Sequence, residues 1–530
     1  GRWPEQWREP LLTCIPKEKP GDFRLIALLH AAYRIWAKDA ARGVSEWMAN
    51  LEDDWIAFGP ELSAENAAYD MALRTEAVDN DKEYTVTMIS DLEKGFEKVG
   101  HSRIAAAADD YGFPKPTLML ALDMYRAARR IKCGAALCRQ VWTDMGVLAG
   151  CPIAMGSLCL AVVRPMRAYL AAQPRGLVTT KVYVDDFTSM YKYGMDEYTM
   201  DEAANEIAFN TRKLHKCLEI EKLYLAPDKS KILTTNKELA KKIEARLADL
   251  GYTHEVEVKL LGVDWASGGN ITYGSAKKRI VKATKAVANL SKYVVGGVKY
   301  LNIARAHATG AARYGCTTMG IPPQLLGKVR TMVRSAIATR AKGGSATMDM
   351  ALQKETEVDP AYMAAKTPIE KWATIMYDND SDIKQTAKKA WKEACSRYIK
   401  WKADNEDTSR WQNISGPASA VLATFEDIGW KMSSPSRVTT DTGETMDMEK
   451  QRPHLVITKV AQAVERKVLA RLFPGPRCWL SPALLRDPRH LGFSGGLTDV
   501  AQLSLAARYR VFAHEAWREG GLRVNRRARE

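Results

Sequence analysis

The chain has 530 residues, of which 46% are hydrophobic and 27% are charged. This length predicts several domains, and this share of apolar residues excludes a disordered chain. Lysine and arginine outnumber aspartate and glutamate by 78 to 63, which gives a net charge of +15. Such an excess arises on ordinary solubilising surfaces, but at this size we favour a polyanionic partner, most simply nucleic acid.

The nine cysteines are scattered along the chain, and no C-x-x-C pair has a matching second half. This pattern argues against a zinc site and favours free thiols in a reducing compartment. Residues 145–163 form the longest uncharged apolar run, but Gly150, Pro152 and Gly156 interrupt it, so we expect a buried loop and helix and no membrane partner. The chain begins with Gly1 rather than methionine, and we therefore expect a fragment of a longer polyprotein.

Residue periodicity predicts mixed helices and strands up to about residue 270. Two apolar runs around a Pro-Gly turn predict a β-hairpin over 11–28, with Lys17 and Arg24 near its turn. Helical spacing predicts helices at 31–48, 63–78, 102–111, 114–130 and 200–219. Alternating β-branched and aromatic residues predict strands at 84–90, 140–142, 222–225, 230–234 and 256–263. The strand at 84–90 ends at Asp91.

After residue 275 the strands give way to basic, helical stretches. We expect helices at 277–293, 300–315, 323–342 and 416–430, with a boundary at the glycine-rich loop 342–345. The tryptophans between 372 and 411 suit helix packing better than base stacking. Residues 437–448 contain Asp441-Thr442-Gly443, which predicts a hairpin turn.

The hexapeptide Val182-Tyr183-Val184-Asp185-Asp186-Phe187 places two adjacent aspartates between strand-forming residues, so we expect a β-hairpin with both at its tip. Adjacent carboxylates repel each other, and they are tolerated in water or used where a divalent cation neutralises them. For the hexapeptide alone, a plain Asp-Asp turn explains the pattern equally well. Asp91, at the end of a strand, is the candidate third carboxylate. Three such groups would hold two Mg²⁺ ions about 3.5–4 Å apart, which activate an attacking hydroxyl and stabilise a leaving pyrophosphate.

With these residues in view, the chain resembles the reverse transcriptases, most closely the polymerases of non-LTR (LINE-type) retrotransposons, over about residues 7–350. The resemblance rests on seven blocks in one order, namely 15–17 with 23–28, 58–60 with Ser63, 91–99, 146–152, 183–186, 225–230 and 260–263. It implies an α+β, right-hand polymerase fold. Fingers and a palm with an antiparallel sheet would occupy 1–270, a helical thumb 275–350, and a mostly helical extension of unknown role 351–530, with a hairpin at 437–448.

The resemblance also implies the roles of the site residues. Asp91 and Asp185 are expected to bind metal, with Asp186 as a third ligand, and Mg²⁺ is the expected ion, with Mn²⁺ as the alternative. Lys229 would protonate the pyrophosphate leaving group. Phe96, five residues after Asp91, corresponds to the aromatic gate that excludes a ribose 2′-OH.

Four further residues would contact the nucleotide. Lys17 and Arg24 would hold its triphosphate, as a point charge and as a bidentate fork. Ala149 and Gly150 fall where the family usually has a glutamine followed by glycine, so the glutamine amide that contacts the incoming nucleotide is absent here. The bland alternatives are that Phe96 packs in the core and that Lys17 and Lys229 are solvated.

The expected reaction is RNA-templated extension of a DNA or RNA primer with dNTPs, in support of retrotransposition. An RNA-dependent RNA polymerase fits less well, because that family normally has an aspartate where Phe96 stands. A catalytically inactive relative that only binds RNA is the alternative from another class, and Ala149 keeps it open. If the chain derives from a retrotransposon, it is expected inside the cell, in the nucleus or the cytoplasm.

Overall fold

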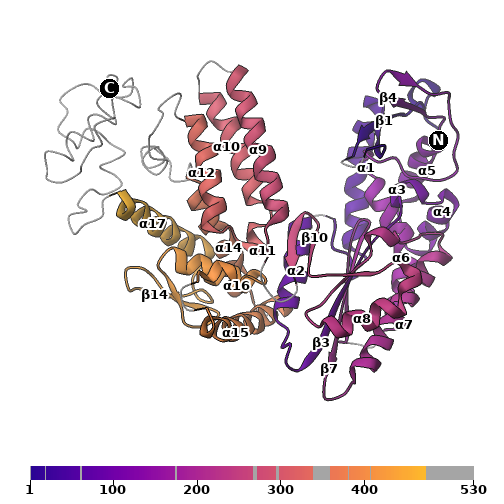
Figure 1. Cartoon of the computed structure of the whole chain (residues 1–530). Helices are drawn as coiled ribbons and strands as arrows, with labels where there is room; N and C mark the ends of the chain where they lie inside the picture. Colours follow the sequence, from indigo (N-terminus) through magenta and orange to yellow (C-terminus); the bar gives the residue numbers. More distant parts are fainter. Residues whose placement is uncertain are drawn as a thin grey trace, which may run out of the picture. The chain divides into compact units, whose positions relative to one another are not determined.

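The computed structural model describes most of the first 472 residues, namely 2–17, 20–59, 62–173, 176–266, 271–293, 298–337, 359–379, 381–405 and 408–472. The chain forms two compact units (Figure 1). The first consists of residues 1–261 and 265–269, and the second of 262–264 and 270–530. The two are described separately below. The predicted thumb and C-terminal extension belong to the same unit.

The first unit mixes helices with two sheets. Its helices are α1 (Ala31–Ala49), α2 (Ala64–Glu76), α3 (Gly95–Lys98), α4 (His101–Asp110), α5 (Lys115–Tyr125), α6 (Ala154–Ala171), α7 (Met200–Ile220) and α8 (Lys237–Arg246). Its strands are β1 (Leu11–Pro16), β2 (Phe23–Leu28), β3 (Glu83–Asp91), β4 (Arg130–Cys133), β5 (Ala136–Leu137), β6 (Val178–Tyr183), β7 (Asp186–Gly194), β8 (Lys231–Leu233), β9 (Thr253–Glu255) and β10 (Glu257–Leu260). The division between the units falls at β11 (Val263–Ala266).

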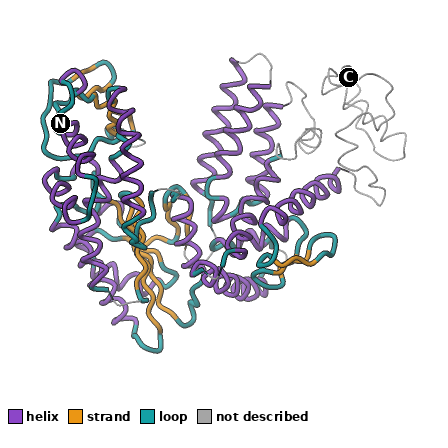
Figure 2. The backbone as a smooth tube through the Cα atoms, turned by 180° about the vertical axis from the view of Figure 1, so that it is seen from behind, coloured by secondary structure: helices purple, strands orange, loops and turns teal. Residues whose placement is uncertain are grey.

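The central sheet has five strands in the order β6-β7-β3-β8-β9, seen as the strand layer of this unit in Figure 2. All its pairs are antiparallel except β8–β9, which is parallel. Val86 and Met88 of β3 point to one face, where they form a hydrophobic cluster with side chains of α7 and α8. Because successive side chains of a strand alternate between faces, Ile89 and Asp91 point to the opposite face. The sheet therefore presents Asp91 away from α7 and α8.

A second sheet of four strands, in the order β2-β1-β4-β5, corresponds to the predicted fingers hairpin and its continuation. Strands β1 and β2 pair antiparallel from Leu11 opposite Leu28 to Pro16 opposite Phe23. Strand β4 then adds to β1 in parallel. The predicted hairpin is confirmed.

Helix α7 shows why a predicted helix begins where it does. Thr199 Oγ accepts a hydrogen bond from the Glu202 backbone N–H (3.3 Å), and the Glu202 carboxylate accepts one from the Thr199 backbone N–H (2.8 Å). This reciprocal capping box satisfies two N–H groups that the helix cannot pair internally. Apolar residues at helical spacing, including Ile207, Leu214 and Leu218, are then buried.

The second unit is mostly helical. Its helices are α9 (Gly274–Tyr293), α10 (Val298–Arg313), α11 (Cys316–Met319), α12 (Pro323–Ile337), α14 (Pro360–Tyr377), α15 (Asp382–Ala403), α16 (Pro417–Asp427) and α17 (Pro453–Leu472). Three short strands form one antiparallel sheet, β12 (Lys431–Met432), β13 (Arg437–Thr439) and β14 (Thr445–Asp447). The predicted hairpin at 437–448 is thus present. No described helix of the chain is both long and apolar enough to cross a membrane.

Several predicted boundaries were wrong. The helix expected at 114–130 ends at Tyr125, because the chain from Arg130 pairs with β1. The strand expected at 256–263 is two strands, since Leu261 and Gly262 both have positive φ (49° and 82°) and form a tight turn. No strand forms at 222–225 or 140–142, where only isolated bridges occur. The end of the helix expected at 323–342 and the loop 342–345 lie outside the described residues, as do residues 473–530.

Candidate active site

The two adjacent aspartates lie where strand β6 turns into β7. Tyr183 pairs with Asp186, so Val184 and Asp185 are the two residues of the turn, and Asp186 is the first residue of β7. Val184 has a φ of 62°, which a β-branched residue rarely adopts. Tight turns of two residues need such positive φ values, and the turn here obtains one from valine rather than glycine.

The third carboxylate lies directly across the sheet. Asp91 is the last residue of β3 and is the registered partner of Asp186. Directly opposed residues of an antiparallel pair have side chains on the same face and close together. The backbone secures the arrangement, because Leu92 N–H donates to the Asp185 carbonyl oxygen (2.9 Å). The structure therefore brings together all three aspartates that the sequence singled out.

Their electrostatics reflect this crowding. Burial, followed by the charges of Asp185 and Asp91, raises the pKa of Asp186 to about 7. Burial and then the charge of Asp91 also raise the pKa of Asp185. Half-buried carboxylates that repel one another hold their protons more tightly, unless cations offset the charge. The site is thus a concentration of negative charge that the protein compensates only in part.

Lys229 supplies part of the missing positive charge. It ends a short 3₁₀ turn, Pro227–Lys229, and its Nζ forms an ion pair with Asp91 Oδ2. Desolvation lowers the pKa of Lys229, but the hydrogen bond to Asp91 and the nearby charges outweigh it, and the net pKa is raised. Ala226 N–H donates to the Asp91 carbonyl oxygen (2.8 Å), which holds the turn that carries Lys229 against β3.

The fit of divalent cations can be judged from these atoms. Asp91 Oδ1 is buried and has no hydrogen-bond partner, although an acceptor of this kind is rarely left unsatisfied. Among the described residues, no three histidine, cysteine or acidic side chains are already grouped so that they could hold a metal ion. The carboxylates therefore suit cations by charge and by one unsatisfied oxygen, while Lys229 occupies the other oxygen of Asp91.

The segment after Asp91 packs against the hairpin turn. Lys94 has a φ of 54° and precedes helix α3, and Gly95 follows it. A Cβ placed on Gly95 would lie 3.6 Å from the Asp185 Cβ and 3.1 Å from the Leu92 Cβ. No role was predicted for Gly95, although its position soon after Asp91 was the available signal.

Phe96 is half-buried beside the main hydrophobic core of the unit, so the structure agrees with both the gate and the packing interpretation. Its backbone oxygen accepts a hydrogen bond from Val147 N–H (2.8 Å). Val147 belongs to the loop 146–150, whose other end reaches strand β2, because the Ala149 oxygen accepts from Ala27 N–H (2.8 Å). The loop thus connects helix α3 to strand β2.

Gly150 is required where the loop meets β2. Its φ is 103°, and a Cβ there would lie 3.1 Å from the Ala27 carbonyl oxygen. Ala149 is half-buried and presents only a methyl group. The absence of the usual glutamine therefore removes an amide from this position but leaves the backbone connection intact.

The two predicted triphosphate ligands behave differently. Arg24 is an exposed residue of β2, paired with Ile15, and its charge acts on Asp185 to lower the carboxyl pKa against the larger effect of burial. Lys17 is also exposed, and its backbone N–H donates to the Asp22 oxygen (2.9 Å) to close the hairpin. The structure relates Arg24 electrostatically to the carboxylates, whereas the contacts described for Lys17 are those of its turn.

Comparison with solved structures returned similarities of low identity. The telomerase from Candida albicans, in complex with a TWJ fragment of telomeric RNA, is 11% identical with a TM-score of 0.41, and the alignment covers 77% of this chain and 67% of that one. The apo telomerase from Candida tropicalis, truncated from its C-terminal domain, is 13% identical with a TM-score of 0.34, with 49% of this chain and 54% of that one covered. The chain thus spans about half the length of the latter.

A search of the curated proteins found no match. A family model does match, and the matched residues, 15–265, run from the end of β1 into β11. They include all three aspartates, Lys229, Phe96 and the loop 146–150. Residues 15–265 of this chain therefore contain a reverse transcriptase (RNA-dependent DNA polymerase) domain.

Proposed function

We propose that this domain extends a DNA or RNA primer with dNTPs along an RNA template. The observation that carries the proposal is the register of the central sheet. It sets Asp91 opposite Asp186 at the end of the ladder, with Asp185 in the adjoining turn. Mg²⁺ or Mn²⁺ ions bound to these carboxylates would activate the primer hydroxyl and stabilise charge on the leaving pyrophosphate.

The surrounding residues have complementary tasks in this proposal. The carboxylates hold negative charge at one point of the palm, and Arg24 and Lys17 on the fingers hairpin attract the triphosphate. Lys229, whose ammonium group lies beside Asp91, would give a proton to the leaving group. Phe96, at the start of α3, limits the sugar to a 2′-deoxyribose.

Primer extension by the purified protein on poly(rA)/oligo(dT) tests the proposal. We expect dTTP incorporation that requires Mg²⁺ or Mn²⁺ and falls by about 100-fold or more in the Asp185→Asn/Asp186→Asn variant. The template choice also addresses the RNA-polymerase alternative, because UTP should be a poor substrate. Equal use of UTP and dTTP would favour that alternative.

A catalytically inactive, RNA-binding relative is the second candidate, and Ala149 is the observation that favours it. With a methyl group in place of an amide, the loop 146–150 provides no side-chain hydrogen bond for an incoming nucleotide. RNA binding without dNTP incorporation under either metal would support this candidate and overturn the polymerase proposal.

We further propose that the domain serves a non-LTR retrotransposon, on the strength of the seven ordered sequence blocks. The test is genomic. An endonuclease coding region in the same reading frame as this chain, in several copies with different flanks, would support the assignment. A single-copy gene without an endonuclease coding region in its reading frame would contradict the retrotransposon assignment.

A further inference from the structure

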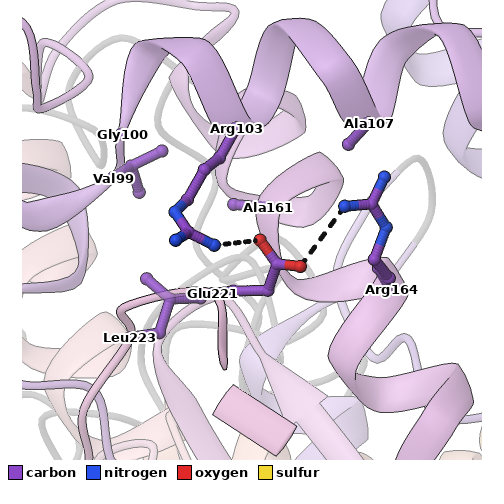
Figure 3. Close-up of a pocket in the computed structure, with 8 residues that line it drawn as sticks. All are labelled: Val99, Gly100, Arg103, Ala107, Ala161, Arg164, Glu221 and Leu223. Atoms are coloured by element: carbon purple, nitrogen blue, oxygen red, sulfur yellow. Dashed lines mark hydrogen bonds and ion pairs between the residues drawn. The ribbon is translucent and has the colours of Figure 1, made fainter. Parts of the chain in front are cut away.

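A buried carboxylate outside the proposed active site joins three parts of the palm. Glu221 follows the last residue of α7 and is only 9% exposed. Figure 3 shows its carboxylate between two guanidinium groups in a small pocket. Arg103 Nη1 donates to one of its oxygens (2.9 Å), and Arg164 Nη1 donates to the other (3.3 Å).

The two arginines come from helices that follow the predicted active-site segments. Arg103 belongs to α4, which the chain enters soon after Asp91 and Phe96. Arg164 belongs to α6, which follows the loop 146–150. One carboxylate therefore ties both helices to the end of α7. Burying a carboxylate destabilises the fold unless the charge is paired, and here each oxygen of Glu221 accepts a hydrogen bond from an arginine.

Glu221 also lies at the start of the segment that leads to Lys229. Arg103 Nη1 donates to the Ile220 carbonyl oxygen as well (2.6 Å), so the same arginine caps the end of α7. Lys222 then turns the chain with a φ of 56°, and Leu223 N–H donates back to the Leu218 oxygen (3.0 Å). These hydrogen bonds fix the direction in which the chain leaves helix α7.

From there the backbone runs along the end of β3. Glu93 N–H donates to the Tyr224 oxygen (2.8 Å), and Leu225 forms a bridge with Leu92. Ala226 N–H then donates to the Asp91 oxygen, and three residues later Lys229 reaches the Asp91 carboxylate. A continuous series of contacts thus connects Glu221 to the ion pair of the active site.

We propose that Glu221 is a positioning residue, which fixes the segment 221–226 against β3 and so holds Lys229 beside Asp91 during nucleotide transfer. The proposal rests on the proposed polymerase function for its kinetic consequence, but its structural consequence can be measured without activity. Glu221 touches neither the carboxylates nor the nucleotide site, so it acts only through the backbone that it holds.

The test compares Glu221→Gln and Glu221→Asp with a matched control, Asp53→Asn. Asp53 pairs with Arg167 of the same helix α6 (2.8 Å), and its side chain is 16% exposed, against 10% for Glu221. Hydrogen exchange of the Glu93 and Ala226 amides measures how firmly the segment 221–226 is bonded to the end of β3, because both amides donate hydrogen bonds between the two. We expect exchange about 10-fold faster in Glu221→Gln, and near the unaltered rate in Asp53→Asn.

Kinetics supply the second measurement. In Glu221→Gln we expect kcat to fall about 10-fold while the KM for dNTP changes by less than about 3-fold, because ground-state binding does not depend on Lys229. Glu221→Asp keeps the charge and should recover most of the loss. Unchanged amide exchange in Glu221→Gln, or an equal kcat loss in Asp53→Asn, would overturn the proposal. Absence of dNTP incorporation by the unaltered protein would overturn the polymerase function alone, while the exchange rates would still decide whether Glu221 holds the segment.

Discussion

At the scale of single residues, Asp186 shows most directly how a group proposed for metal binding can reduce the stability of the fold. Its side chain lies half-buried against Asp91 and Asp185, and its pKa rises from an ordinary 3.8 to about 7. Because the pKa of this carboxyl is higher in the folded state than in the unfolded chain, the protonated form stabilises the fold. That contribution is complete at low pH and is lost as the pH rises through about 7.

Replacing Asp186 by asparagine should therefore stabilise the protein while it abolishes activity. Above pH 7 and with EDTA present, we expect the free energy of unfolding to increase by about 1–3 kcal/mol, and the gain to shrink as the pH falls to about 4. Chemical denaturation at several pH values measures this. The exposed Asp196→Asn is the control and should show no such pH dependence. Destabilisation of Asp186→Asn at every pH would show that the carboxylate makes net favourable contacts.

Phe96 is the residue expected to select the sugar. Replacing it by valine leaves space for a 2′-OH, so we expect the ratio of UTP to dTTP incorporation, compared as kcat/KM, to rise about 10-fold or more. Phe113→Val is the control, because Phe113 is a core residue packed against Trp47 and its loss should alter stability alone. If both variants change the ratio equally, Phe96 is a packing residue, which is the alternative that the half-buried side chain leaves open.

At the scale of elements, the loop 146–150 determines how the four-stranded sheet and α3 are joined. At one end of the loop the Ala149 oxygen accepts a hydrogen bond from Ala27 N–H, and at the other end Val147 N–H donates to the Phe96 oxygen. The sequence identified this loop through its glycines, but it did not show that the two ends are held by backbone groups. Backbone hydrogen bonds carry no residue-specific signal, so only the folded chain reveals them.

Gly150→Ala tests that connection. The added Cβ meets the Ala27 oxygen at 3.1 Å, and alanine strains a φ of 103°. We expect a loss of about 1–3 kcal/mol in stability and a lower kcat/KM for dNTP. Gly112→Ala is a matched control, since Gly112 also has a positive φ (64°) but a Cβ there would meet nothing within 4 Å. It should lose stability only. An unchanged kcat/KM for dNTP in Gly150→Ala would show that the loop 146–150 does not contribute to the nucleotide site.

Element boundaries show where sequence patterns fail. Residues 256–263 alternate apolar with charged side chains at their start, which predicts one strand, yet the pair Leu261-Gly262 turns the chain within it. Residues 222–225 look like a strand, but Lys222 adopts a positive φ and the chain makes a single bridge to Leu92. In both places, contacts with distant segments override a local preference that is weak for short runs.

At the scale of the whole molecule, the net charge of +15 predicts binding to RNA that weakens with salt. Helix α9 places Lys278 and Lys282 one turn apart on its exposed side. If they contact phosphates, Lys278→Gln/Lys282→Gln should reduce the slope of log K against log salt by about 2. Fluorescence anisotropy with an RNA–DNA hybrid, over about 50–200 mM salt, measures the slope.

The control for this prediction is Lys237→Gln/Lys241→Gln, which removes the same charge from an exposed turn of α8. Helix α8 packs on the face of the central sheet that lies opposite Asp91. We expect this variant to bind RNA with an unchanged slope. Equal slopes for the two double variants would mean that the charge acts as a general field rather than through contacts of α9.

The sequence by itself singled out the candidate reacting groups. Tyr183-Val184-Asp185-Asp186, Asp91 at a strand end and the ordered blocks around them depend on residue type and spacing, which are local properties. It also determined most helices and the three hairpins, because hydrophobic periodicity and turn residues act within a few positions.

Only the tertiary structure decided how those groups are held. The pairing of Asp91 with Asp186, the ion pair of Lys229 and the two arginines on Glu221 join residues from 57 to 138 positions apart in the chain. Arg103, Arg164 and Glu221 are common surface residue types, and nothing in their neighbours along the chain distinguishes them. Their importance arises from burial and mutual distance, and these exist only once the chain has folded.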